Sequence, residues 1–379
     1  MRLVTRVIVL LSRAMQHAAP DPSSASPLPL SGSEDLVRSE RDGGVGVAFR
    51  PALDAVGEAL LRHMVRARVV SARMVGLQRS EKIGYHHASL GEEAAIVGAV
   101  LAMRATDWIF PGAREWYAGL ARGLPLGVYV HHAFGSAEDP TNGHAAPDHA
   151  PARALHVVPP SGVIGAHLPQ AVGAAWAAKI ERANVATLAL FGAEVAASGD
   201  FHNALNFGGV FKAPVVFVCR AKPDARIVDR AVAYGLASAR VDGADALAVF
   251  TVVKAALARA TEGKGPTLVE VVSPSLERVT AGAIDDAALA AGDVLDLGAG
   301  DPVARLGALL ARENRASAGA QKVLAAEVMA ELDAAVLAAE RAGAPAPATI
   351  FEHVYAGVPA HLAAERQRLT GAQWDGGGG

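Results

Sequence analysis

Two positively charged side chains follow a hydrophobic run near the middle of the chain. Arg220 and Lys222 come directly after the β-branched run Val215–Cys219. Cationic side chains at the end of a strand suit phosphorylated or carboxylate ligands, and the planar fork of arginine suits phosphate best. Glu194 lies on an earlier loop, where it is interpreted as a solvated carboxylate. These residues predict an anion-binding crevice.

The surrounding pattern shows which elements must position these side chains. The apolar run Val185–Phe191 predicts a strand, Ser198–Phe211 predicts a helix, and Val215–Cys219 predicts a second strand. Together they form one βαβ unit. Because ligands bind beyond the carboxyl ends of parallel strands, Gly192–Ala197 and Arg220–Arg226 should form two walls of one crevice.

The same stretch carries a family resemblance. AVGAAWAAK upstream and SGDFHNALNFGGVFKAPVVFVCR downstream resemble the α subunit of the thiamine-diphosphate-dependent E1 component of 2-oxo acid dehydrogenase complexes, of the branched-chain and pyruvate type. The resemblance spans about residues 53–370. It implies an α/β fold with a doubly wound, mainly parallel sheet flanked by helices, followed by a helical C-terminal segment.

The cofactor motif departs from the family at both side-chain metal ligands. The resemblance places Ala193 at the family's acidic position and Lys222 at its metal-binding asparagine. Mg²⁺ prefers oxygen ligands in octahedral geometry, and neither a methyl group nor an ammonium supplies one. Glu194 is one residue along, where a turn directs its side chain elsewhere. No cofactor is therefore expected with Mg²⁺, and thiamine diphosphate itself stays possible only through the resemblance.

Other family positions are partly kept. Arg114 stands at the arginine that contacts the diphosphate, with an ion pair as the alternative interpretation; His149 matches a histidine that would line the crevice mouth, or is a plain loop residue. Gly162 replaces a serine near the diphosphate, and Arg278 stands at the histidine that works at the cofactor. No catalytic residue is assigned. The candidate cofactor-binding residues are Arg114, Arg220, Lys222 and His149.

Composition restricts the remaining possibilities. The chain has 379 residues, of which 51% are hydrophobic, and a net charge of −3. This charge argues against a nucleic-acid surface, and no apolar run is long enough to span a membrane. A single cysteine, Cys219, suits a reducing cytoplasm and should pack as a small hydrophobe. The thirteen histidines include adjacent pairs but no His-Glu-x-x-His spacing, so no zinc site is assigned.

The expected organisation is one domain with loose ends. Residues 1–50 are rich in Pro, Ser and Gly and predict a flexible arm, 51–370 form a single α/β domain, and 371–379 form a flexible tail. Within the domain, residues 318–342 have the pattern of a long amphipathic helix.

Three hypotheses of function remain. The first is a degenerate E1α-like subunit with a structural or regulatory role, which pairs with an E1β-like subunit and with itself as α2β2. The second is an active thiamine-diphosphate-dependent 2-oxo acid dehydrogenase, which transfers an acyl group to the lipoyl group of an E2 component. The third is a sensor of an anionic metabolite that reuses the crevice.

Overall fold

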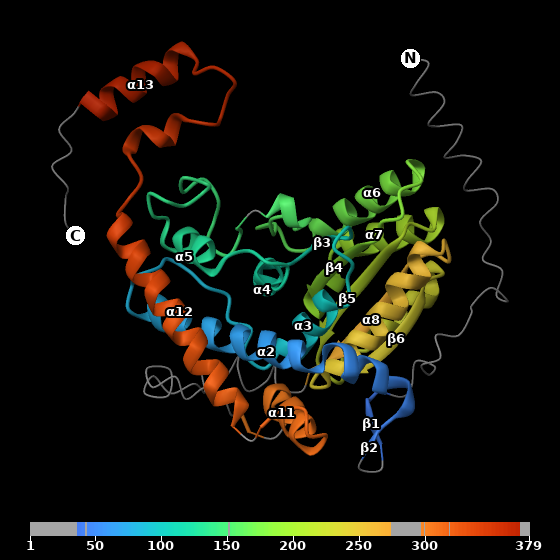
Figure 1. Ribbon diagram of the computed structural model, residues 1–379. Helices are drawn as coiled ribbons and strands as arrows, with labels where there is room; N and C mark the ends of the chain where they lie inside the picture. The colour runs from blue at the N-terminus through green and yellow to red at the C-terminus, as the bar shows by residue number, and fades with distance from the viewer. Residues whose placement is uncertain are drawn as a thin grey trace, which may run out of the picture.

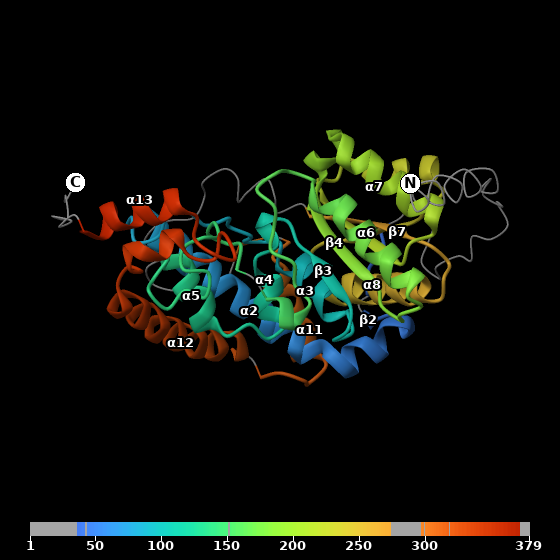
Figure 2. The same ribbon diagram turned by 90° about the horizontal axis from the view of Figure 1, so that it is seen from above.

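The computed structural model describes residues 36–41, 44–150, 152–273, 297–298, 300–317 and 319–371. Its centre is a parallel five-stranded sheet in the order β3-β4-β5-β7-β6 (Figure 1). Helices cover both faces of the sheet, with α6 and α7 on one side and α8 on the other (Figure 2). The predicted doubly wound α/β fold is confirmed. The strands are β3 (Trp108–Phe110), β4 (Thr187–Gly192), β5 (Val215–Ala221), β6 (Ala237–Asp242) and β7 (Thr267–Val272).

The helices agree with the predicted amphipathic and apolar segments. The predicted helix at Ser198–Phe211 is observed as α7, with Ser198 as the N-cap residue whose hydroxyl accepts from the Phe201 N–H. The α-helices are α2 (Arg50–Arg79), α3 (Glu93–Leu101), α4 (Tyr117–Ala121), α5 (Leu126–Phe134), α6 (His167–Ile180), α7 (Gly199–Phe211), α8 (Ala246–Thr261), α11 (Pro302–Arg312), α12 (Ala320–Ala342) and α13 (Ala360–Gly371). The 3-10 helices are η1 (Val47–Phe49), η2 (Ala113–Glu115), η3 (Arg153–Leu155), η4 (Ala193–Ala197), η5 (Ile227–Tyr234) and η6 (Pro347–Phe351).

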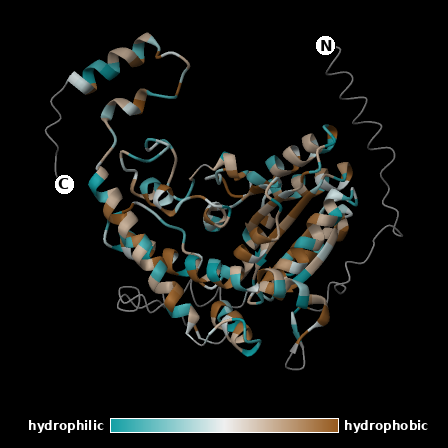
Figure 3. Cartoon of the chain, in the orientation of Figure 1, coloured by the Kyte–Doolittle hydropathy of each residue, from teal (hydrophilic) through white to brown (hydrophobic). Residues whose placement is uncertain are grey.

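Two hydrophobic cores lie on the two faces of the sheet. Successive strand residues point to opposite faces, so Leu188 and Leu190 pack into the core beneath α8, whereas Phe191 and Phe217 pack into the core beneath α6 and α7. Figure 3 shows the hydrophobic residues gathered on the strands and their flanking helices. Cys219 is fully buried in the second core, as expected of a small hydrophobe.

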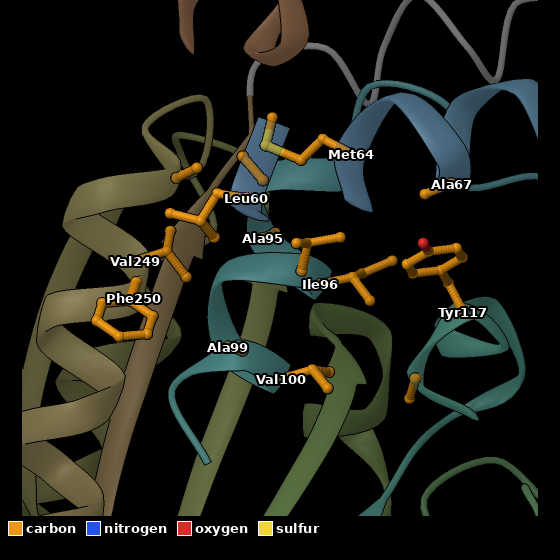
Figure 4. Close-up of a cluster of buried hydrophobic side chains, with 14 of the residues drawn as sticks. Leu60, Met64, Ala67, Ala95, Ile96, Ala99, Val100, Tyr117, Val249 and Phe250 are labelled. Carbon is orange, nitrogen blue, oxygen red and sulfur yellow. The ribbon is translucent and has the colours of Figure 1, made fainter. Parts of the chain in front are cut away.

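Helix α3 lies at the centre of the larger core. Its sequence EAAIVGAVL is apolar on every side after the first residue, because it packs between α2 and α8 (Figure 4). A Cβ atom on Gly98 would lie 3.0 Å from the Val249 side chain and 3.1 Å from the Ala246 carbonyl oxygen. Glycine at this position therefore permits the close approach of α3 and α8.

The predicted long helix at 318–342 is observed as α12, which packs along α2 and α5. Ion pairs flank this contact, among them Arg66 of α2 with Glu331 and Lys82, just after α2, with Glu340. The buried residues of α12 recur at helical spacing. They are Ala325, Val328, Leu332, Val336 and Ala339.

The packed part of the domain begins before residue 51. Val37 forms a bridge to Val241 of β6, and Phe49 is buried in the larger core. A short hairpin, β1 (Glu40–Arg41) and β2 (Gly44–Val45), lies between them. The expected domain boundary at residue 50 is therefore wrong, because the apolar side chains of Val37 and Phe49 pack on the domain. Residues 1–35 and 372–379, for which loose ends were expected, lie outside the described residues.

The C-terminal segment after α12 is helical, as expected, and extends away from the body of the molecule (Figure 1). Helix α13 has no buried residue, and Ile350, Val354 and Tyr355 before it are more than half exposed. In the part of the chain that the structure describes, every helix is too short or too polar to cross a bilayer.

The packing of α12 makes a testable prediction. Leu332 is fully buried, whereas Leu337 on the same helix is 46% exposed. Leu332→Ala should lower the free energy of unfolding by about 2–5 kcal/mol, because it leaves a cavity in the core. Leu337→Ala is the matched control and should change it by less than about 0.5 kcal/mol. Urea denaturation measures both, and equal effects would contradict this placement of α12.

Candidate functional site

The carboxyl ends of β3, β4 and β5 bring three loops together. The Gly112 N–H after β3 donates to the Leu190 carbonyl of β4 at 3.1 Å, which draws η2 over the end of β4. At the neighbouring strand end, Gly192 of β4 pairs in register with Arg220 of β5. The loops Gly192–Ala197 and Arg220–Arg226 therefore lie side by side, as the βαβ pattern predicts.

Arg220 is a buried ion-pair centre at this edge of the sheet. Its Nη2 and Nε lie 2.5 and 2.6 Å from Glu115 Oε1, and its Nη1 lies 2.5 Å from Glu92 Oε2. All three residues are less than 5% exposed. The cofactor-binding role of Arg220 stays a prediction, and in this structure its guanidinium contacts two carboxylates of its own chain.

The electrostatics of this trio follow from burial. Burial lowers the pKa of Arg220, but the charges of Glu115 and Glu92 outweigh that effect and raise it far above its ordinary value. Burial raises the pKa of Glu92, the Arg220 charge opposes this, and the Glu115 charge adds to it. With both acids ionised, the trio carries a net charge of −1, and the cation at the strand end is fully compensated.

The two family metal positions differ in exposure. Ala193 is the partly buried first residue of η4, and Lys222 is exposed directly after β5. Glu194 is exposed, yet its carboxylate folds back over Gly192, where a Cβ atom would overlap with it. One carboxylate therefore does reach the end of β4. The described residues nevertheless contain no group of three His, Cys, Asp or Glu side chains that could hold a metal ion. A methyl group, an ammonium and one carboxylate do not fit Mg²⁺.

Arg114 and His149 occupy separate surroundings. Arg114 lies partly exposed in η2, where its charge lowers the pKa of Glu92. His149 is partly buried, and its Nδ1 lies 2.6 Å from the Pro147 carbonyl oxygen. No hydrogen bond within the described residues joins His149 to Arg114 or Arg220, whereas the charges of both arginines act on the pKa of Glu92. Arg278, at the family's histidine position, lies outside the described residues.

Gly162, at the family's serine position, lies on an exposed turn. No heavy atom comes within 4 Å of the place that its Cβ would take. A serine would therefore fit sterically, and the loss is one of hydrogen-bonding groups rather than of space.

The sequence interpretation missed the partners of the buried arginines. Glu92 faces Arg220, and Glu93 pairs with the fully buried Arg68. Acidic residues opening an apolar helix were the available signal, because buried carboxylates require cationic or hydrogen-bonding partners. His167 was also missed. Its Nε2 donates to the Leu190 carbonyl, and burial lowers its pKa.

Replacing Arg220 tests the ion-pair centre. Arg220→Met should lower the free energy of unfolding at pH 7 by about 3–5 kcal/mol, because two carboxylates stay buried without a counter-ion. The pKa of Glu92, already raised, should rise further, so the folded state binds its proton more tightly than the unfolded chain does. The deficit should therefore shrink as the pH falls through the raised pKa of Glu92, and level off near the ordinary glutamate pKa of about 4.3, where the unfolded chain binds the proton too.

Lys222→Met, which removes an exposed cation two residues along, is the matched control and should cost less than about 0.5 kcal/mol. Chemical denaturation from neutral to acidic pH measures both variants. If the loss of unfolding free energy in Arg220→Met did not change with pH, uncompensated buried carboxylates would not be its cause.

Comparison with known proteins agrees with this geometry. The profile of the family described as "Dehydrogenase E1 component" matches residues 61–348. The 2-oxoisovalerate dehydrogenase subunit alpha of Bacillus subtilis is 32% identical over 332 residues, which cover 84% of this chain and 99% of that protein. The mitochondrial 2-oxoisovalerate dehydrogenase subunit alpha of Mus musculus is 30% identical over 309 residues, which cover 77% of this chain and 69% of that protein. The chain therefore belongs to the dehydrogenase E1 component family, as an α-type subunit of the 2-oxo acid dehydrogenases.

Proposed function

We propose that this chain is a cofactor-site-degenerate E1α-like subunit that serves assembly or regulation in the cytoplasm. It pairs with an E1β-like subunit and with itself as α2β2, and it does not bind thiamine diphosphate through Mg²⁺. The observation that carries the proposal is the pair of substitutions at the metal positions, Ala193 and Lys222, beside an arginine that two internal carboxylates already compensate.

The charge balance of the crevice supports the proposal. The acidic residues of its walls and of the Arg220 centre are Glu92, Glu115, Glu194 and Asp224, and the basic residues are Arg114, Arg220, Lys222 and Arg226. Equal numbers of the two signs leave no excess positive charge for a diphosphate, which normally relies on a divalent cation to neutralise it. The same balance weighs against a sensor of anionic metabolites, because Arg220 would have to release its own carboxylates first.

The C-terminal segment supports a role in assembly. Ile350, Val354 and Tyr355 present apolar side chains to solvent on a segment that extends from the domain body (Figure 1). Exposed apolar side chains that gather on one segment are typical of a surface that a partner covers.

Calorimetric titration tests the proposal. The protein, purified together with its native partner, is titrated with thiamine diphosphate in the presence of Mg²⁺. We expect no saturable heat in the micromolar range. The double variant Ala193→Glu, Lys222→Asn restores both family ligand types and serves as the matched comparison. Micromolar binding to the unmodified complex that a chelator abolishes would refute the proposal.

An active enzyme is the second candidate, and the exposed position of Lys222 favours it. An ammonium at the end of β5 can contact a phosphate as a point charge, in place of the metal. The reaction would be oxidative decarboxylation of a 2-oxo acid, followed by acyl transfer to the lipoyl group of an E2 component.

This candidate makes a distinct prediction. Thiamine diphosphate should bind equally well with and without a chelator, and Lys222→Ala should weaken binding at least about tenfold, because it removes a charged contact. Decarboxylation of a 2-oxo acid by the complex in the presence of chelator is the activity readout. Absence of both binding and turnover in the unmodified complex would eliminate this candidate and leave the first.

A further inference from the structure

The loop after α5, residues 135–150, is fastened to the domain by aspartate–histidine contacts. Asp139 lies 3.1 Å from His132 of α5, and Asp148 lies 3.1 Å from His86 and 3.4 Å from His87. None of these contacts involves the Arg220 centre. The side chains of His132 and Asp139 are 0% and 1% exposed, so their contact is shielded from water.

Both ring nitrogens of His132 face groups that can only accept hydrogen bonds. Nδ1 lies 3.1 Å from Asp139 Oδ1, and Nε2 lies 3.0 Å from the Ala146 carbonyl oxygen. A neutral imidazole carries one N–H and one lone pair, so one of these short contacts would set two acceptors against each other. A doubly protonated ring satisfies both.

Asp139 has the hydrogen bonds of an ionised carboxylate. It accepts from the Thr141 hydroxyl at 2.7 Å and from the Thr141 and Gly143 N–H groups at 3.0 Å. Burial raises the pKa of Asp139, but these donors and His132 outweigh it and hold the pKa below its usual range. The Asp139 oxygens therefore do not supply a proton to His132, and the proton must reside on the ring.

We propose that His132 is a buried imidazolium that latches the 135–150 loop, and that closure of this loop is linked to binding of one proton. The closed loop holds a proton that the open loop releases. Closure is therefore favoured at lower pH and weakened as the pH rises and His132 loses its charge.

The latch is linked through the chain to the candidate residue His149 and to the end of α12. Ala146, one of the two acceptors, is followed by Pro147, Asp148 and His149. Asp148 accepts from the Tyr129 hydroxyl at 2.7 Å and from the His87 N–H at 2.6 Å. At the other end of the loop, the Ala137 N–H donates to the Gly343 carbonyl at the end of α12. Release of His132 would loosen the loop that carries His149 and contacts the C-terminal segment.

The other charged groups around α5 have different partners. His131 faces the Ser136 hydroxyl at 2.7 Å and Glu138 at 3.4 Å. Helix α12 packs on α5, but its acidic residues pair with basic residues of α2 and of the turn after it, in the ion pairs Arg66–Glu331, Arg73–Asp333 and Lys82–Glu340. Among the residues that the structure describes, Asp139 is the charged group in contact with His132.

The first test reads the protonation of His132 in the unmodified protein. Long-range ¹⁵N–¹H correlation of the histidine rings should show both nitrogens of His132 protonated at about pH 7. His167 is the internal comparison, because burial lowers its pKa and its single acceptor is the Leu190 carbonyl, so it should show one protonated nitrogen. A neutral His132 ring in a protein whose loop is protected from exchange would overturn the proposal.

The second test reads the loop itself. The protection of residues 139–147 against hydrogen exchange, corrected for the intrinsic effect of pH, should fall at least about tenfold between about pH 6 and about pH 9. This is the effect expected from the loss of one hydrogen bond to a charged group. His132→Gln, which carries no charge, should show the low protection at every pH. His131→Gln is the matched control and should keep the pH dependence, because the Ser136 hydroxyl can donate to a neutral ring. If the protection of the loop in the unmodified protein did not vary with pH, the latch would be contradicted. If His132→Gln fails to fold, the measurement of the ring protonation decides the question.

Discussion

The buried charge of Arg220 constrains the whole edge of the sheet at which the crevice lies. A guanidinium at the end of a central strand is taken out of water, so it must be compensated by nearby carboxylates. Glu115 supplies one from η2 and Glu92 supplies the other from the start of α3. One arginine therefore joins β5 to two segments that come much earlier in the chain, and the crevice walls are set by that requirement.

The start of α3 is a junction between two buried charge networks. Glu92 faces Arg220 at the sheet, and the next residue, Glu93, pairs with Arg68 of α2. Arg68 also contacts Asp301, the N-cap residue of α11. Because breaking a buried pair leaves an uncompensated charge, these contacts fix the sheet and the helical layer relative to one another. The apolar body of α3 can then be packed without polar groups of its own.

The charges at this edge of the sheet are balanced within the chain. The sheet, α3 and α12 lie within residues 61–348, which match the E1 family. At the carboxyl end of β5, two carboxylates of the same chain compensate Arg220. The charge balance of this buried centre therefore does not depend on a bound ligand.

The sequence alone determined the elements and the departures of the cofactor motif. The βαβ unit could be recognised because strand and helix periodicities are local, and Ala193 and Lys222 could be placed because the family motif is contiguous. The tertiary structure decided which charges meet: Arg220 and Glu115 are 105 residues apart, and no local pattern encodes their contact. It also decided that Val37 and Phe49 join the core, and that His132 lies between two acceptors. Such partners depend on how distant segments of the chain are brought together. In a buried site, these partners determine the protonation state of each side chain and whether it can still bind a ligand.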